Sequence, residues 1–235
     1  MIIGVDEAGR GPVIGPMVIA GVLTDEGTAK ELAGLGVKDS KKLTPRRREE
    51  LSKAISERCQ VHLVLLAPCE IDKRREKESL NLIEARVYSA IIAELLARLP
   101  SEGARDCVAY VDAVDVNEGR YGDTIRAYLP ERFKGVRIVS KHKADDIYPV
   151  VSAASIMAKT RRDSEVDRIA QELGSEIGSG YPADPVTDKF LRDWLRTHKE
   201  LPPCVRRSWE TVRRMIKERD TKYKTLDEYT RDGGN

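Results

Sequence analysis

The chain changes between two spacings of apolar residues. Runs rich in β-branched and aliphatic residues, bounded by glycine, proline or charged residues, lie at 1–5, 13–23, 61–67, 108–111 and 136–139. Short runs with such boundaries are typical of strands. Gly9, Gly11 and Pro12 separate the first two runs, which predicts a hairpin with Asp6 and Glu7 at the end of its first strand.

A spacing of three or four residues dominates elsewhere. Apolar residues recur at this interval from Leu80 to Leu99, where Pro100 closes the segment. Thr44 and Pro45 supply an N-cap and a first residue for another helix through Glu57. Further helices are predicted at 120–128 and 147–173, around Trp194 and around Trp209.

Strands that alternate with helices after an initial hairpin predict an α/β fold with a mixed central sheet flanked by helices. The glycine-rich stretch 174–180 interrupts this pattern. We therefore expect a core at 1–175, a C-terminal helical extension packed on the core at 176–220, and a flexible polar tail at 221–235.

Composition narrows the class of protein. The 235 residues support one main domain, and the four cysteines form no C-x-x-C pair, so neither a disulfide framework nor a zinc site is expected. The longest nearly uncharged run, 11–24, is too short to span a bilayer and contains two prolines. These features predict a monomer in a reducing cytoplasm, with no membrane partner.

The charge balance is nearly even, because 41 basic residues stand against 39 acidic ones. The distribution says more, since basic residues gather at 38–48, 141–143, 159–162 and 206–219. Basic segments around an acidic centre suit a polyanion that cations hold and a metal site cuts. Taken singly, each basic segment is explained more simply as a solvated helix face.

Four acidic residues far apart in the chain carry the candidate chemistry, namely Asp6, Glu7, Asp112 and Asp145. They lie beside predicted strand ends or a helix start, and no chelating set of Cys or His accompanies them. Oxygen-only ligands suit Mg²⁺, a hard cation that keeps waters for a phosphate substrate to displace. The acids therefore predict a phosphodiester enzyme in which one ion generates hydroxide and another stabilises the departing oxygen.

Plainer roles stay open for several of these residues. Asp6 and Glu7 alone also fit a polar turn after an edge strand. Asp146 fits the N-cap of the helix that follows it, and Tyr181 also fits a core tyrosine. His142 lies in a basic loop, where phosphate contact or loop structure is favoured over proton transfer.

Five segments in fixed order and spacing point to a family. They are Asp6–Gly11 (DEAGRG), Lys38–Leu43 (KDSKKL), Tyr110–Ala113 (YVDA), Lys141–Asp145 (KHKAD) and Ser152–Ile156 (SAASI). With these segments the chain resembles type 2 ribonuclease H, ribonuclease HII, in its archaeal form, and the likeness runs from residue 2 to about residue 215. The combination is far more specific than any one segment.

The resemblance implies a ribonuclease H-like core and an endonuclease that cuts the RNA strand of RNA/DNA hybrids. It also implies cleavage 5′ of single ribonucleotides embedded in duplex DNA, with 3′-hydroxyl and 5′-phosphate ends. Carried over by motif position, the metal ligands are Asp6, Glu7, Asp112 and Asp145. Mg²⁺ is the expected metal, with two ions in the site during catalysis and Mn²⁺ as a substitute.

The same resemblance implies a set of substrate contacts. Gly9, Arg10 and Gly11 match the family element whose tight turn approaches the ribose and detects its 2′-hydroxyl. Tyr181 matches the tyrosine that packs at the step from ribonucleotide to deoxyribonucleotide. Cations that fix the duplex without reading bases are expected at Lys41, Lys143 and Arg161, although Arg161 also fits a solvated helix face.

Two other functions compete with this one. A strand-transfer or integrase-like nuclease uses similar acids and two metals on the same fold, but it has no need to sense ribose. A non-catalytic hybrid-binding protein would be expected to lack one of the acids, and all four are present.

The polar tail carries a separate resemblance. Residues 223–230 resemble the peptide that binds a sliding clamp, with Leu226 as the aliphatic anchor and Tyr229 as an aromatic residue three positions later. The segment departs from that pattern because it lacks the leading glutamine and the second aromatic residue. A sliding clamp is therefore a possible partner of the tail.

Overall fold

The structure is a computed structural model that describes residues 1–37 and 43–232, with side chains described as far as Thr221. It contains two compact units. Unit 1 comprises Met1–Arg10, Met17–Leu66 and Lys77–Ser164, and unit 2 comprises Gly11–Pro16, Ala67–Glu76 and the chain from Glu165. Two short segments from the first third of the chain thus belong to unit 2, and the boundary expected at residue 175 stays a prediction.

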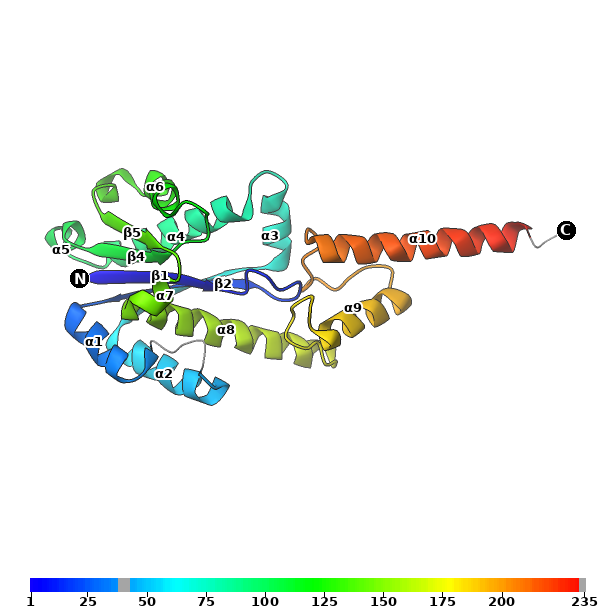
Figure 1. Cartoon of the computed structure of the whole chain (residues 1–235), viewed down its shortest axis with the longest axis horizontal. Helices are drawn as coiled ribbons and strands as arrows, with labels where there is room; N and C mark the ends of the chain where they lie inside the picture. The colour runs from blue at the N-terminus through cyan, green and yellow to red at the C-terminus, as the bar shows by residue number, and fades with distance from the viewer. Residues whose placement is uncertain (38–42, 233–235) are drawn as a thin grey trace. The chain divides into compact units, whose positions relative to one another are not determined.

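A five-stranded sheet forms the centre of unit 1 (Figure 1). Its order is β3-β2-β1-β4-β5, with antiparallel pairing of β1 with β2 and β2 with β3, and parallel pairing of β1 with β4 and β4 with β5. The predicted hairpin and mixed sheet are confirmed. The strands are β1 (Ile2–Ala8), β2 (Met17–Thr24), β3 (Gln60–Leu66), β4 (Val108–Asp112) and β5 (Arg137–Lys141).

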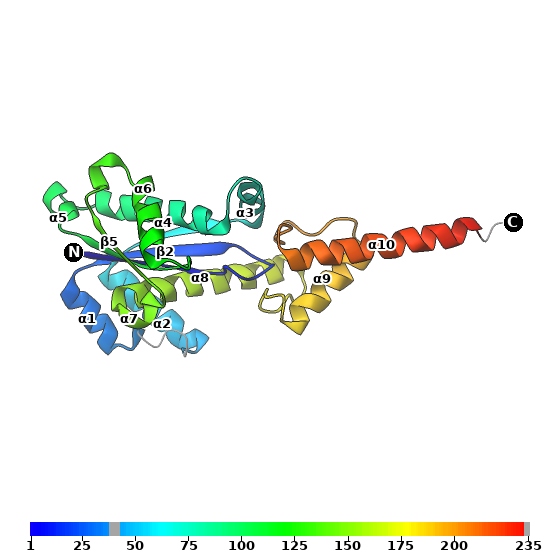
Figure 2. The same cartoon turned by 45° about the horizontal axis from the view of Figure 1, so that its top comes forward.

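Helices cover both faces of this sheet (Figures 1 and 2). One face carries α4 (Leu80–Ala97) and α6 (Glu118–Tyr128), and the short α5 (Ser101–Arg105) lies between α4 and β4 in the chain. The other face carries a core formed with α1 (Glu26–Gly34), α2 (Pro45–Arg58), α7 (Ala144–Ile147) and the first part of α8 (Pro149–Leu173). The helices predicted at 45–57 and 80–99 are confirmed to within two residues at each end.

The helix predicted at 147–173 is confirmed as α8 (Pro149–Leu173), and a separate short helix, α7, precedes it. Tyr148 has an extended backbone (φ −108°, ψ 115°), as expected for a residue before proline, and α8 begins at Pro149. Lys143 is the N-cap residue of α7, while Asp146 is the third residue inside that helix. The prediction of Asp146 as an N-cap is therefore wrong.

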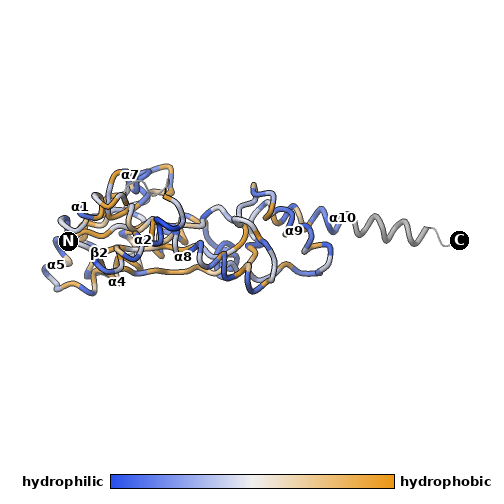
Figure 3. Tube along the Cα trace, turned by 90° about the horizontal axis from the view of Figure 1, so that it is seen from below, coloured by the Kyte–Doolittle hydropathy of each residue, from blue (hydrophilic) through white to orange (hydrophobic). Residues whose placement is uncertain are grey.

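Unit 2 has its own apolar core, built from residues of α8, α9 (Pro185–Thr197) and α10 (Glu210–Asp232) together with Val13 and Ile14. It also contains α3 (Pro68–Arg75). The described part of α10 carries many hydrophilic positions (Figure 3). The backbone of 221–232 continues this helix, and the segment contains neither glycine nor proline. The flexible tail expected at 221–235 stays a prediction.

Across the described residues, no helix combines the length and apolar character that crossing a membrane requires.

Candidate active site

β1 places Asp6 and Glu7 on opposite faces of the sheet. Both residues lie inside the strand, where Asp6 pairs with Ala20 and Glu7 pairs with Ile19 of β2. Side chains alternate along a strand, so neighbouring acids point in opposite directions. The prediction that both acids lie at the end of the first strand is confirmed, because β1 ends at Ala8.

The Asp6 face of β1 lies against α8. Gly4, on the same face, has no room for a side chain, because an added Cβ would overlap the backbone carbonyl of Val150. Along α8, Ser155 lies five residues after Val150, a rise of about 7.5 Å. Along β1, Asp6 lies two residues after Gly4, a rise of about 6.6 Å. The two paths match, and Ser155 hydrogen-bonds to the carboxylate of Asp6, which is 5% exposed.

The electrostatics around Asp6 show that the four predicted acids share one region. Burial raises the pKa of Asp6 well above its ordinary value, and the charges of Glu7, Asp112 and Asp145 raise it further. The hydrogen bond from Ser155 acts in the opposite direction. Segments separated by more than 100 residues in the chain therefore meet around one buried carboxylate.

Asp112 and Asp145 approach Asp6 from β4 and α7. Asp112 ends β4, and its Oδ1 accepts a 2.6 Å hydrogen bond from the backbone N–H of Ala144. Asp145, the next residue, is 4% exposed, and its carbonyl oxygen accepts a hydrogen bond from the Ser152 hydroxyl of α8. Lys143 enters this turn in the left-handed conformation (φ 54°). The turn before α7 thus ties Asp112 to Asp145.

The acids do not form a closed ligand cage. Within the ranges that the structure describes, no three Asp, Glu, His or Cys residues are grouped closely enough to hold one ion. The donor chemistry nevertheless fits a hard divalent cation, because the available donors are carboxylate oxygens and their mutual repulsion raises the pKa of Asp6. A divalent cation would offset that repulsion, so the arrangement suits Mg²⁺ or Mn²⁺.

Glu7 faces α4 and meets two buried tyrosines. The hydroxyl of Tyr88 donates a hydrogen bond to Glu7 Oε2. Burial, followed by the charge of Glu7, raises the pKa of Tyr88 well above its ordinary value, so the phenol stays a donor. Tyr121 of α6 packs edge-on against Tyr88, with ring centroids 5.9 Å apart. A phenol therefore orients Glu7, and a serine hydroxyl orients Asp6.

Arg10, at the end of the DEAGR segment, is also held by α4. Its Nη1 donates to Glu84 Oε2 and its Nη2 donates to Asn81 Oδ1 at 2.6 Å. The Glu84 side chain is fully buried, whereas that of Arg10 is 34% exposed. Two acceptors on α4 thus fix the guanidinium, while part of the Arg10 side chain stays exposed to solvent.

The sequence analysis missed these partners on α4. Glu84 and Tyr88 lie on the same buried stripe as Ile91 and Leu95, with spacings of four, three and four residues. A carboxylate on an apolar stripe is a signal that the sequence does contain, since an unpaired buried charge is unfavourable. The partner, Arg10, is 74 residues away and is not indicated by the sequence.

The predicted ribose-sensing residues divide between the two units. In unit 1, Gly9 has a positive φ of 84°, which favours glycine. In unit 2, a Cβ added to Gly11 would lie 3.3 Å from Cε1 of Tyr181. Tyr181 is 43% exposed, so it is not the core tyrosine that was its plainer alternative. The carbonyl of Gly180 accepts a 2.8 Å hydrogen bond from the backbone N–H of Val13.

Two of the three predicted phosphate contacts lie within the described residues. Lys143 and Arg161 are exposed, and Lys41 lies outside the described residues. The ring of His142 faces backbone oxygens of the loop after β4, with Nδ1 3.2 Å from the carbonyl oxygen of Ala113. These contacts fit a role of His142 in loop structure, one of the two roles favoured from the sequence over proton transfer.

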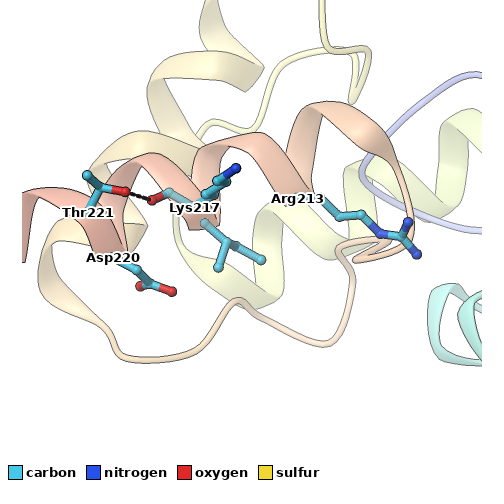
Figure 4. A pocket seen from close by; sticks show the side chains of 5 residues that line it. Arg213, Lys217, Asp220 and Thr221 are labelled. Carbon is cyan, nitrogen blue, oxygen red and sulfur yellow. Dashed lines mark hydrogen bonds between the residues drawn. The ribbon is translucent and has the colours of Figure 1, made fainter.

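A cavity of about 390 Å³ lies along α10 in unit 2 (Figure 4). Arg213 and Lys217 contribute two cations four residues apart, and Asp220 and Thr221 complete the polar lining. The Thr221 hydroxyl donates to the carbonyl of Lys217 at 2.9 Å. This cavity contains none of the predicted site residues, but it lies in the basic segment 206–219.

The chain is similar to known proteins in both sequence and structure. The family model for ribonuclease HII matches residues 3–212. The ribonuclease HII of Methanocella arvoryzae is 44% identical over 216 residues, covering 92% of this chain and 91% of that protein. Two solved structures are 40% identical. The ribonuclease H2 of Pyrococcus horikoshii has a TM-score of 0.83 and the alignment covers 93% of this chain and 98% of that one.

The second structure is a PCNA:RNase HII complex from Archaeoglobus fulgidus, with a TM-score of 0.79 and coverage of 92% and 96% of the two chains. These likenesses confirm the predicted ribonuclease H-like core. Together with the family match, they show that the chain belongs to the ribonuclease HII family in its archaeal form and is an endoribonuclease H.

Proposed function

We propose that the protein cuts the RNA strand of RNA/DNA hybrids and also cuts 5′ of ribonucleotides embedded in duplex DNA, leaving 3′-hydroxyl and 5′-phosphate ends. Membership of the ribonuclease HII family supports the first activity. The observation that carries the mechanism is the buried Asp6 carboxylate with Glu7, Asp112 and Asp145 around it. A monomer in the cytoplasm is the expected working form.

The four acids would hold two divalent ions, Mg²⁺ with Mn²⁺ as a substitute. When bound, such ions lower the pKa of water and neutralise charge that develops on the phosphate. The residues of this chain orient the ligands: Ser155 directs Asp6, and Tyr88 directs Glu7. Outer hydrogen bonds of this kind fix ligand geometry before the substrate arrives.

Recognition of ribose would fall to the Gly9–Gly11 turn and to Tyr181. The positive φ of Gly9 lets the backbone turn where a side chain would be strained, and an added Cβ at Gly11 would press on the ring of Tyr181. An exposed aromatic ring beside a glycine offers a flat surface for a sugar or base. Lys143 and Arg161 are proposed to contact phosphates, as is Lys41.

Cleavage of a labelled DNA duplex with one ribonucleotide tests this function. The assay is run with Mg²⁺, with chelator, and beside an all-DNA duplex and an RNA/DNA hybrid. We expect metal-dependent cuts in the hybrid and a single cut 5′ of the ribonucleotide. Cutting of the all-DNA duplex would favour the strand-transfer function, and binding of the hybrid without any cut would favour the non-catalytic one.

A sliding clamp is the second proposed partner. The Archaeoglobus relative was solved as a complex with PCNA, and residues 223–230 of this chain resemble a clamp-binding peptide. Titration of the full chain, and of a chain that ends at residue 221, with the clamp of the same organism tests this. Binding that the deletion abolishes supports the proposal, and binding that it leaves unchanged, or no binding, overturns it.

A further inference from the structure

One face of α4 carries polar side chains where a core helix would ordinarily be apolar. Asn81, Glu84 and Tyr88 are separated by three and four residues, so they lie on one face of the helix. All three contact the DEAGR segment: Asn81 and Glu84 bind Arg10, and Tyr88 binds Glu7. A single rigid helix therefore contacts a proposed substrate residue and a proposed metal ligand.

The contacts of Arg10 fix the plane of its guanidinium. A guanidinium is flat and carries its donors in a rigid fork. Because Nη1 binds Glu84 and Nη2 binds Asn81, two acceptors from successive turns of α4 define its orientation. The side chain remains 34% exposed, so a substrate can reach it from the opposite side.

Glu84 cannot itself touch a substrate, because its side chain is fully buried. One of its oxygens binds Arg10, and in the described structure the other, Oε1, is buried without a hydrogen-bond partner. A buried ion pair with incomplete hydrogen bonding adds little to stability compared with apolar residues of the same size. Its value is better explained by the direction that it imposes on Arg10.

We propose that Glu84, assisted by Asn81, is the positioning residue for Arg10 in substrate recognition. This inference rests on the proposed function, because it takes Arg10 to contact the ribonucleotide strand. Glu84 acts only through Arg10. Loss of the Glu84 charge therefore weakens recognition when Arg10 is present and has no effect when Arg10 is absent.

A double-mutant cycle on the full-length enzyme tests this dependence. The variants are Arg10→Ala, Glu84→Gln and the two combined, and kcat and KM are measured on the duplex with one ribonucleotide. We expect Glu84→Gln to lower kcat/KM by about 10- to 100-fold, the effect of one charge-assisted hydrogen bond, mainly through KM. The double variant should be no worse than Arg10→Ala alone.

Two further variants keep the test decisive. Asn81→Ala removes the second acceptor without leaving a buried charge, and its smaller loss should also vanish in the Arg10→Ala background. Glu94→Gln is the matched control, because Glu94 is on the same helix, is 52% exposed and pairs with Arg98; it should behave as wild type.

The outcomes separate this inference from the proposed function. Wild-type enzyme that fails to cut the ribonucleotide duplex overturns the proposed function. Wild-type cutting with additive losses in the double variant, or with normal kinetics for both Glu84→Gln and Asn81→Ala, overturns the positioning role alone. If Glu84→Gln does not fold, the Asn81→Ala cycle decides.

Discussion

Asp6 and Glu7 are adjacent in β1, but the two faces of the strand give them different surroundings. On the α8 face, Asp6 is almost completely buried, receives a hydrogen bond from Ser155 and has a raised pKa. On the α4 face, Glu7 is half-buried and accepts a hydrogen bond from the Tyr88 phenol. One strand thus supplies two carboxylates with different environments and separate supports.

This difference shows how neutral hydroxyl donors can orient the carboxylates of an acid-rich site. Serine and tyrosine are neutral donors that orient a carboxylate and leave its charge available for a metal. The two supports come from different helices, α8 and α4, on opposite sides of the sheet. Each support can therefore be removed by its own substitution, and the predictions below use this.

The largest effect is expected from removal of the buried charge. Asp6→Asn should lower kcat/KM by more than about 100-fold, because loss of an outer-shell partner alone costs about 10- to 100-fold. The melting temperature measured in chelator should not fall, since the change removes repulsion by Glu7, Asp112 and Asp145. Asp123→Asn is the control, because Asp123 is 74% exposed and pairs with Arg126. Near-normal turnover of Asp6→Asn would sink the assignment.

The next largest effect is a loss of stability caused by disturbing the packing of β1 against α8. Gly4→Ala should destabilise the protein by about 3 kcal/mol, the upper end for overpacking, because the added Cβ meets the backbone of Val150 and backbone yields little. Denaturant unfolding measures this loss. Gly34→Ala is the matched control, since its Cβ would meet nothing within 4 Å, and it should change stability by less than about 0.5 kcal/mol. Equal stabilities of the two variants would contradict the close approach.

A pair of conservative variants sharpens the comparison. Ser155→Ala removes the donor to Asp6, and Tyr88→Phe removes the donor to Glu7. Each should raise the Mg²⁺ concentration needed for half-maximal activity by about 10-fold, the lower range for an outer-shell partner. The double variant should need more Mg²⁺ than either single variant, because the two donors support different acids of one site. A metal requirement that stays at the wild-type value in both variants would contradict the supports described here.

The smallest effect is expected away from both faces. Asp184 is the N-cap residue of α9, and hydrogen bonds from Ser179, followed by that from the Val186 N–H, lower its pKa. A lowered pKa in the folded state contributes stability above the unfolded pKa of about 3.9 and loses it as the pH falls further. The melting temperatures of wild type and Asp184→Ala should therefore differ at pH 6, and the difference should shrink as the pH falls below about 4 and through the lowered folded pKa. A difference that persists unchanged at pH 3 would refute this titration.

Much of the fold was predictable from local patterns. The hairpin, the mixed sheet and the helices near 45–58 and 80–97 follow from apolar spacing, N-caps and proline positions. The start of α8 was placed two residues too early, although Pro149 signals it through the restricted backbone of the residue before proline. The helix through 221–232 was not predicted, because its many threonine, tyrosine and aspartate residues are weak helix formers and give little local signal.

The candidate site was predictable in part. The four acids were predicted from residue type and motif position, and the structure brings Glu7, Asp112 and Asp145 around Asp6, while their role as metal ligands stays a proposal. Glu84, Asn81 and Tyr88 were not found, because their partners Arg10 and Glu7 are more than 70 residues away. Periodicity shows that a helix position is buried, but it does not show which side chain is buried opposite.

The sequence by itself determined the α/β class, the set of acids and the family, because these depend on local spacing and on residue types at motif positions. Tertiary structure alone decided that Asp6 faces α8 and Glu7 faces α4, and that α4 holds Arg10. The physical reason is that the register of β1 with β2 sets the face of every side chain, and the packing of two helices on those faces sets its partners. Both depend on contacts between segments that are distant in the chain, so local sequence patterns do not reveal them.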